Sequence, residues 1–503
     1  MIKLLVLSLF AGLIYVFSFS PFDHNLTTFV SIIIFFYALQ KSPTIKLSFF
    51  IGWLYGIGLY GGGIHWVYYS ISTFGEEIAP IAGVLTFVFI ITLGLVYAVF
   101  ALFYFYINKK ITANYDYLLL PLLWFWFEIL RSWIFTGFPW VLAGSGQIDG
   151  FLKSYLPVVG VYGVSFIIAF LSYVILSLLL PIIKKEYNFF YCIQTKVLVF
   201  FSVIILLFAW GLNDISWTQK DNKTLNAAII QANIKQEIKF SKERLKNSLD
   251  IYTKMSMEQP QEIELVVWPE TAIATFYHRK KDHLKNLQQK LSPITIISGI
   301  FTKNKNNGEY YNSAIKLSHP VQTYSKEQLV PFGEYMPLKE IFDFFKKYIN
   351  IPMSNLRPHS KNQKPIYVKG IAIDMSICYE SAYTLDLYQR VSGRSLMINI
   401  SNDAWFGDSI APAQHLQIAR TRAKEYGRQM IRSTNNGISA FIDEKGKIIK
   451  KTSQFKKQTI SNKMQTFRGQ TPFMKFGIMP MYALSILFLL LLTLNLFRNK
   501  DMA

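Results

Sequence analysis

The sequence predicts an α/β protein with a membrane region: eight transmembrane helices and one layered domain outside the bilayer. Of its 503 residues, 51% are hydrophobic and only 17% are charged, with a mean hydropathy of +0.26, which is too apolar for an ordinary soluble enzyme. Charge is also uneven, because residues 1–212 hold 10 Lys/Arg and 7 Asp/Glu whereas residues 213–479 hold 40 and 23. We therefore expect seven membrane helices in residues 1–212, an α/β domain in residues 213–479, and an eighth helix with a short tail in residues 480–503.

Eight apolar runs are candidate membrane helices, although the second and seventh are short for a span of roughly 17–25 residues. The runs are 4–20, 26–40, 47–69, 79–107, 117–136, 156–183, 197–212 and 480–497. The first resembles a signal peptide, but Ser18-Phe19-Ser20-Pro21-Phe22 is not a small-residue cleavage site and seven more runs follow. We expect the first helix to be retained.

Basic residues in the short loops set the expected orientation. Eight spans sort the loops into two sets, of which one holds ten basic residues: Lys3, Lys41, Lys46, Lys109, Lys110, Lys184, Lys185, Lys196, Arg498 and Lys500. The short loops of the other set, 21–25, 70–78 and 137–155, hold only Lys153. Because basic loops stay in the cytoplasm, both termini are expected there and residues 213–479 outside. Cys192 is then cytoplasmic and Cys378 extracytoplasmic, so no disulfide can join them.

Cysteine and histidine usage argues against several classes of protein. Two cysteines cannot build a disulfide framework or a cysteine-based metal site, and the seven histidines include no His-Glu-x-x-His pair. We therefore do not expect a metalloenzyme. The formal charge of +21 suits anionic membrane lipids or other acidic partners; we expect a monomer among membrane lipids and no nucleic-acid partner.

Residues 213–479 read as alternating strands and helices. Runs rich in β-branched residues occur at Leu225–Gln231, Leu265–Trp268, Thr295–Ile300, Ala314–Leu317, Ile371–Ile377, Leu396–Ile400 and Ile438–Ile442. Several are continuously apolar, as in strands buried on both faces. The charged amphipathic stretches Ser241–Gln259 and Pro412–Glu425 predict helices, and the alternation indicates a layered α/β domain. The lysine-rich stretch Asp443–Lys463 is expected to be a solvated hairpin, with a membrane-facing patch as the alternative.

Three polar residues lie beside strand-like runs, where open α/β sheets place their binding crevices. Glu270 follows Leu265–Pro269, Lys326 precedes Leu329–Tyr335, and Cys378 ends Ile371–Ile377. Singly, each has an ordinary explanation as a solvated loop residue, a surface lysine or an inert core thiol. Together they form a chemical device, because a thiol needs a base to become a thiolate and an acyl-transfer oxyanion needs positive charge or N–H donors. With no candidate histidine nearby, a carboxylate is the expected base.

Several segments resemble the Glu-Lys-Cys motifs of the nitrilase or carbon–nitrogen hydrolase superfamily. They are Trp268-Pro269-Glu270-Thr271-Ala272, Tyr324-Ser325-Lys326 with Leu329-Val330-Pro331-Phe332-Gly333-Glu334-Tyr335, and Cys378-Tyr379-Glu380. Together with the apolar runs, the match narrows to the apolipoprotein N-acyltransferase family. It also covers Pro21-Phe22, Gly137-Phe138-Pro139-Trp140, Gln231-Ala232-Asn233-Ile234-Lys235-Gln236, Ser401-Asn402-Asp403-Ala404-Trp405-Phe406-Gly407 and Arg432-Ser433-Thr434-Asn435-Asn436-Gly437. One difference from the family pattern is Phe473 in Gly469-Gln470-Thr471-Pro472-Phe473, where a tyrosine is expected. This difference affects only a local contact.

The resemblance implies an αββα sandwich outside the bacterial cytoplasmic (inner) membrane, with no metal or organic cofactor. It implies that Glu270 is the general base, Lys326 stabilises tetrahedral intermediates and Cys378 is the nucleophile. A phospholipid donates its sn-1 acyl chain to Cys378 as a thioester. The α-amino group of an apolipoprotein's diacylglyceryl-cysteine then takes that chain in a ping-pong cycle. The chemistry agrees with the residues, because a thioester is reactive enough to acylate an amine.

Further residues are candidates around this triad. Glu334 and Glu380 are expected to flank it and to position Lys326, with structural ion pairing as the alternative. Tyr379 and Trp405 could line the acyl or headgroup path or could simply pack.

In the membrane region, Glu128 and Arg131 are three residues apart on one predicted helix, so they can pair on one face. The pair could contact a lipid headgroup or hold helices together. The small residues Gly52 and Gly56 are expected to permit close helix packing rather than to bind lipid.

Two other functions remain open on the sequence. A membrane-tethered amidase would use the same triad with water as the acceptor, although a soluble substrate needs no membrane helices. A transporter or lipid-binding scaffold would have lost activity, although all three triad residues stand in complete motifs.

Overall fold

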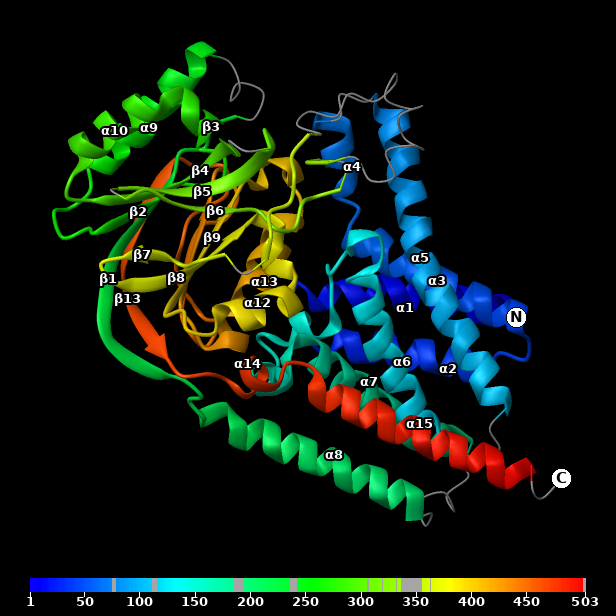
Figure 1. Ribbon diagram of the computed structural model, residues 1–503. Helices are drawn as coiled ribbons and strands as arrows, with labels where there is room; N and C mark the ends of the chain where they lie inside the picture. The colour runs from blue at the N-terminus through cyan, green and yellow to red at the C-terminus, as the bar shows by residue number, and fades with distance from the viewer. Residues whose placement is uncertain are drawn as a thin grey trace. The chain divides into compact units, whose positions relative to one another are not determined.

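The computed structural model describes residues 1–74, 78–110, 115–184, 193–235, 242–304, 307–318, 320–331, 333–335, 355–361 and 363–500 (Figure 1). Cys192, expected in the cytoplasm, lies outside these residues. The chain divides into two compact units. Unit 1 comprises Met1–Tyr68, Ile78–Ile215 and Lys475–Ala503, and unit 2 comprises Tyr69–Glu77 and Ser216–Met474.

Unit 1 is built from apolar helices. They are α1 (Ile2–Tyr15), α2 (Thr27–Gln40), α3 (Ile45–Gly63), α4 (Val67–Tyr69, at the boundary with unit 2), α5 (Ala79–Lys110), α6 (Asp116–Arg131), α7 (Leu156–Lys184), α8 (Ile193–Gly211) and α15 (Met479–Lys500). Among the described residues, three helices are long and apolar enough to cross a membrane, or four if one bent pair counts as a single span. These helices fit a membrane-associated protein, and the count of eight spans stays a prediction.

Small residues let α3 approach its neighbour closely. A Cβ atom on Gly56 would lie 2.7 Å from the Cα atom of Gly94 on α5. One on Gly52 would overlap the carbonyl oxygen of Tyr97 on the same helix. The glycines of α3 therefore serve close helix packing, as the sequence predicted.

Unit 2 contains two β-sheets. The first has the order β13-β1-β2-β4-β5-β6, with β3 also paired to β4. Its strands are β1 (Gln219–Gln231), β2 (Leu265–Val267), β3 (Ile273–Phe276), β4 (Thr295–Lys303), β5 (Tyr310–Leu317), β6 (Gln322–Ser325) and β13 (Gln458–Arg468). The central strands β1, β2 and β4 run parallel and are almost wholly apolar and buried where they pair, as expected for strands covered on both faces.

The second sheet has the order β12-β11-β10-β9-β8-β7. Its strands are β7 (Ile366–Val368), β8 (Ile371–Ile377), β9 (Leu396–Ser401), β10 (Met430–Thr434), β11 (Ala440–Ile442) and β12 (Ile448–Lys451). Strand β10 packs against β1, so the two sheets face each other.

Helices cover the outer faces of both sheets (Figure 1). The first sheet forms a buried apolar core with α9 (Lys242–Met257) and α10 (Tyr277–Leu291). On the second sheet lie α12 (Thr384–Val391) and α13 (Ala411–Tyr426), and the short α14 (Pro472–Phe476) follows β13. Helix, sheet, sheet and helix therefore form four layers, as the resemblance implied.

The expected hairpin at Asp443–Lys463 is wrong. Strand β11 turns back at Asp443, whose Oδ1 accepts hydrogen bonds from the backbone N–H groups of Lys445 and Lys447 at 2.9 and 2.7 Å. The returning strand β12 pairs with β11, whereas β13 belongs to the other sheet and pairs with β1. Lys450 and Lys451 lie on β12 and Lys463 lies on β13, and both strands are sheet edges, where charged side chains are common. The charge of these residues therefore did not reveal the crossover between the sheets.

Candidate active site

Glu270 stands where β2 has ended and the chain crosses the neighbouring strand β4. The backbone N–H of Trp268 donates to the carbonyl of Ile297 at 2.8 Å, and the N–H of Gly299 donates to the carbonyl of Pro269 at 3.1 Å. A Cβ atom at residue 299 would lie 2.6 Å from the Cα atom of Glu270. Strand β4 therefore needs glycine at this position to let the Glu270 backbone approach.

Two hydrogen bonds orient the Glu270 carboxylate, which is buried. Its Oε1 accepts from Asn312 Nδ2 at 2.7 Å, and its Oε2 accepts from the backbone N–H of Asn402 at 2.9 Å. Lys326 Nζ lies 3.5 Å from the same Oε1. Glu270 is thus held from β5, from the turn after β9 and from the lysine.

Lys326 follows β6 and is only 1% exposed. Its Nζ lies 2.8 Å from Glu334 Oε2, which also accepts from the backbone N–H of Val330 at 2.9 Å. Burial alone would lower the pKa of Lys326, but the carboxylates of Glu334 and then Glu270 outweigh it and raise the pKa above its usual value. The ammonium group therefore keeps its charge in a dry site.

Asn312 joins the two carboxylates that flank the lysine. Its Nδ2 donates to Glu270 Oε1 at 2.7 Å and to Glu334 Oε1 at 2.8 Å, while its backbone carbonyl accepts from the N–H of Lys326 at 2.8 Å. Sequence reasoning missed this residue. It lies in β5 just before the predicted run Ala314–Leu317, in a strand that also holds Ser313 and Lys316, so its polarity alone gave no signal.

Cys378 begins the 3₁₀ turn η9 (Cys378–Ala382) directly after β8. Its φ angle of +53° is in the left-handed region, which costs a non-glycine residue roughly 1–2 kcal/mol. Burial, and then the charge of Glu270, raise the pKa of the Cys378 thiol to about 12, although Lys326 opposes the shift. The sulfur therefore carries a proton at neutral pH, and the three predicted residues share one electrostatic environment.

Glu380 links the cysteine turn to the segment after the lysine. Its carboxylate accepts from the backbone N–H groups of Ile377, Glu327 and Gln328 at 2.7, 2.6 and 3.2 Å. It also accepts from the Tyr324 hydroxyl at 3.0 Å. Burial raises the pKa of Glu380 to about 7, against the charge of Arg390 and the backbone donors.

Arg390 on α12 supports this link and was not predicted. It donates to Glu327 Oε2 at 2.8 Å, to Asp374 Oδ1 at 2.9 Å and to the Tyr324 hydroxyl at 2.7 Å. All four side chains are buried. An arginine of the amphipathic helix α12 gives no sequence signal that it points inward.

The two candidate aromatic residues also lie in unit 2. Tyr379 is buried, with its ring 5.1 Å from that of Tyr383. Trp405 is half-buried in the turn η10 (Asp403–Phe406), which follows Asn402 and therefore adjoins the backbone that holds Glu270. Its carbonyl accepts from the hydroxyl of Ser70 at 2.7 Å.

Two family models match the chain: the apolipoprotein N-acyltransferase N-terminal domain over residues 11–174 and the carbon–nitrogen hydrolase domain over residues 226–471. A curated apolipoprotein N-acyltransferase from Coxiella burnetii (strain RSA 493 / Nine Mile phase I) is 34% identical over 494 residues, covering 97% of this chain and 99% of its own. The chain belongs to the apolipoprotein N-acyltransferase family.

Other relatives of that name agree. The one from Pasteurella multocida (strain Pm70) is 33% identical over 503 residues, covering 96% of this chain and 94% of its own. A solved carbon–nitrogen hydrolase superfamily protein from Xanthomonas campestris aligns with 48% of this chain and 91% of its own, at 14% identity and a TM-score of 0.36. Family membership makes the chain an N-acyltransferase, which confirms the resemblance inferred from the sequence.

In this N-acyltransferase the Glu128 and Arg131 pair anchors a loop of unit 1. Arg131 lies 3.5 Å from Glu128 and donates to the backbone carbonyls of Trp140 and Val141 at 2.7 and 3.0 Å. Glu128 Oε1 accepts from the backbone N–H of Ala143 at 2.9 Å. Both side chains are buried and bind the backbone of the loop that follows α6. These contacts favour a structural role for the pair over contact with a lipid headgroup.

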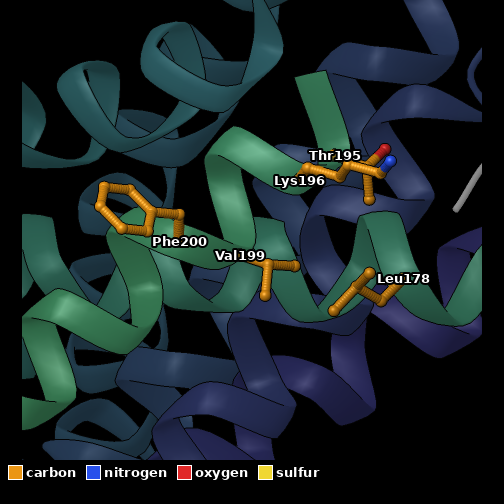
Figure 2. Close-up of a pocket in the computed structure, with 5 residues that line it drawn as sticks. All are labelled: Leu178, Thr195, Lys196, Val199 and Phe200. Atoms are coloured by element: carbon orange, nitrogen blue, oxygen red, sulfur yellow. The ribbon is translucent and has the colours of Figure 1, made fainter. Parts of the chain in front are cut away.

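Unit 1 also has a largely apolar pocket between α7 and α8 (Figure 2). Its lining is Leu178 on α7 with Thr195, Lys196, Val199 and Phe200 on α8. None of the predicted catalytic residues lines it. Among the described residues, no group of three or more His, Cys, Asp or Glu side chains could hold a metal ion.

The protonated sulfur makes a testable prediction about pH. Because the raised pKa keeps Cys378 neutral, its alkylation by iodoacetamide should rise about tenfold per pH unit from pH 7 to 10 without a plateau, since the thiolate is the nucleophile. The rate is measured by mass spectrometry of the Cys378 peptide from the intact protein. A plateau below pH 8 would instead mean a stable thiolate–lysine ion pair.

Proposed function

We propose that this enzyme transfers the sn-1 acyl chain of a membrane phospholipid, through a thioester on Cys378, to the α-amino group of the diacylglyceryl-cysteine at the N-terminus of apolipoproteins. This is the last step of lipoprotein maturation. The observation that carries the proposal is the buried contact set of Glu270 and Lys326 beside the Cys378 thiol. The names of the relatives supply the substrate class.

The first half-reaction forms the thioester. Glu270 takes the proton from Cys378 as the sulfur attacks the sn-1 ester carbonyl, and Lys326 stabilises the oxyanion of the tetrahedral intermediate. As the carbon–oxygen bond breaks, the leaving lysophospholipid alkoxide takes the proton from Glu270. A base is needed because the thiol is neutral in the free enzyme.

The second half-reaction consumes the thioester. The amine attacks the carbonyl, Glu270 takes one proton from the nitrogen, and Lys326 again stabilises the oxyanion. When the intermediate collapses, the thiolate leaves and recovers the proton from Glu270. The amide product and the free thiol complete the ping-pong cycle. Glu334 and Asn312 orient Lys326 and Glu270 through both steps.

The setting proposed for this chemistry is the inner membrane. Eight helices span it, with seven in residues 1–212 and one in residues 480–503, and both termini are cytoplasmic. The catalytic domain, residues 213–479, is extracytoplasmic, where lipid donor and lipidated acceptor meet at the membrane surface. The enzyme acts as a monomer without a cofactor.

The orientation can be tested by thiol labelling. Lys445 is exposed on the β11–β12 turn, so in intact cells or spheroplasts a Lys445→Cys variant should react with a membrane-impermeant maleimide, while Cys192 is shielded until the membrane is permeabilised. Unaltered Lys445 in the parent protein controls for background. Labelling of Lys445→Cys only after permeabilisation would reverse the orientation.

The function itself is tested by mass spectrometry of the purified full-length enzyme incubated with phospholipid alone. A mass increase of one acyl chain on Cys378, removed when a diacylglyceryl-cysteine peptide is added, supports the proposal. Turnover of small lipid-free amides without phospholipid would favour a tethered amidase. An enzyme that binds phospholipid but never acquires an acyl group would favour a scaffold.

Glu270→Gln tests the base. Glutamine keeps an oxygen for the Asn402 N–H but cannot take a proton, so both thioester formation and amine transfer should fall by about 10²–10⁴-fold, the usual contribution of general acid–base catalysis. Single-turnover assays with each substrate alone separate the two steps. Normal acylation with failed transfer would confine the base to the second half-reaction.

A further inference from the structure

Three buried side chains contact the backbone carbonyl oxygen of Cys378. This oxygen accepts hydrogen bonds from Asn399 Nδ2 on β9 at 3.3 Å and from Ser381 Oγ, three residues along the same turn, at 3.2 Å, and it lies 3.2 Å from His415 Nε2 on α13. Asn399 and His415 are both fully buried. Neither belongs to the predicted triad.

A charged pair holds these two side chains in turn. Asp403 Oδ1 lies 3.2 Å from His415 Nδ1, and Asp403 Oδ2 accepts from Arg432 at 3.0 Å. Arg432 also donates to the Oδ1 of Asn399. The Arg432 guanidinium therefore orients Asn399 directly and His415 through Asp403. All four side chains are buried inside unit 2.

This arrangement matters because Cys378 adopts a left-handed conformation, which the chain does not favour for a cysteine. The direction of the Cα–Cβ bond, and so of the sulfur, depends on that backbone. The peptide between Cys378 and Tyr379 is planar, so fixing the carbonyl also fixes the peptide group that follows the nucleophile.

We propose that His415, with Asn399 as its partner donor and the Asp403–Arg432 pair as their support, is a positioning residue that holds the Cys378 backbone in the reactive orientation. The inference rests on the proposed role of Cys378 as nucleophile. His415 touches no substrate and takes no proton from the reaction. Its contribution is to keep the sulfur within attacking geometry, where a misplacement of about 1 Å can cost about 10² in rate.

The two ring nitrogens of His415 have separate partners, which makes the proposal testable. Nε2 lies 3.2 Å from the Cys378 carbonyl oxygen and 3.5 Å from Ser381 Oγ, and Nδ1 lies 3.2 Å from Asp403 Oδ1. The carbonyl and the carboxylate are both acceptors, so both of these contacts are hydrogen bonds when both ring nitrogens carry protons. Burial and Arg432 oppose that cation and lower the pKa of His415, whereas Asp403 and the carbonyl favour it.

Amide side chains can replace one nitrogen at a time. In His415→Gln the amide reaches the place of Nε2 and can donate to Cys378, whereas in His415→Asn the shorter amide reaches the place of Nδ1 and contacts only Asp403. We expect His415→Gln to form the thioester close to the wild-type rate. His415→Asn should be slower by about 10²-fold, with an unchanged dependence on phospholipid concentration.

A role limited to supporting Asp403 predicts the opposite ranking. Asparagine would then rescue and glutamine would not, and that result would overturn the proposal, as would equal rates for both variants. Thr421→Val is the matched control, because Thr421 is a buried polar residue of the same helix whose hydroxyl bonds only to the helix carbonyl of Gln417 at 2.9 Å. It should acylate normally.

A second variant covers the case in which position 415 does not tolerate change. Asn399→Asp keeps an acceptor for Arg432 but removes the donor to the Cys378 carbonyl, so acylation should again fall by about 10²-fold; a wild-type rate would overturn the role of this donor. All assays use the full-length enzyme and single-turnover mass spectrometry. If the wild-type enzyme itself forms no thioester, the proposed function fails, which is distinct from a failed ranking among variants that follows normal wild-type acylation.

Discussion

Replacing Cys378 by alanine should abolish both the acyl-enzyme and the product. In another enzyme with covalent catalysis, loss of the nucleophile costs about 10⁶ in turnover, so the remaining rate should lie below detection. Cys378→Ser should leave little activity, because its hydroxyl is much harder to ionise than a thiol with an ordinary pKa of about 8.5. The measurement is intact mass spectrometry with phospholipid, followed by transfer to a diacylglyceryl-cysteine peptide.

The serine variant is the sharper of the two. Alanine removes the nucleophile, whereas serine keeps a similar size and the same left-handed backbone at position 378. A Cys378→Ser enzyme that accumulated an oxygen ester at the wild-type rate would show that ionisation of the sulfur is not limiting. Product formation by the alanine variant would remove Cys378 from the mechanism altogether.

Lys326→Met should lose both half-reactions while phospholipid binding persists. Each half-reaction passes through a tetrahedral oxyanion, and removal of one oxyanion donor elsewhere costs about 10²–10³ in turnover. A buried cation should lie at the upper end, because charge acts more strongly in a dry site than in water. Lys326→Arg should rescue poorly, because a planar guanidinium cannot occupy the same point.

The control for this variant follows from the ion pair. Removing the lysine leaves the carboxylate of Glu334 buried without its partner, which by itself can destabilise a protein by about 3–5 kcal/mol. The double variant Lys326→Met/Glu334→Gln removes both charges, so it should regain thermal stability without regaining acylation. If Lys326→Met accumulated thioester like the wild type, the oxyanion would be stabilised by backbone N–H groups instead.

The sequence predicted the candidate catalytic residues because they lie next to the ends of predicted strands. Glu270, Lys326 and Cys378 each adjoin a short apolar run, so their proximity in an α/β sheet could be anticipated. Asn312, Arg390 and His415 could not be anticipated, because their partners lie far away in the chain: Asn312 is 42 residues from Glu270, and His415 is 37 from Cys378. A polar residue inside a strand or helix does not reveal from composition whether it points inward.

The same physics explains the error in the lysine-rich stretch. Asp443–Lys463 contains β12 and the first part of β13, where the side chains are half-buried or exposed. Charged residues of this kind do not specify which sheet a strand joins. Strand β10 was also missed, because only Met430 and Ile431 of its five residues are apolar and Arg432 follows them, although this arginine is fully buried against Asp403. In both places a charged residue predicts an exposed side chain. That prediction holds for most of the lysines, but it is wrong for Arg432.

The hydrogen bonds of the Glu380 carboxylate bear on how the enzyme distinguishes its two substrates. By accepting from the backbone N–H of Ile377 on one side and from those of Glu327 and Gln328 on the other, it connects the turn that carries Cys378 to the segment that follows Lys326. We expect the two connected segments to keep the same geometry in both half-reactions. The enzyme must then distinguish the lipid ester from the amine before either reaches the catalytic groups, by the order in which the two substrates enter and leave the site. An inhibitor that blocks substrate entry should therefore stop both half-reactions without contacting the triad.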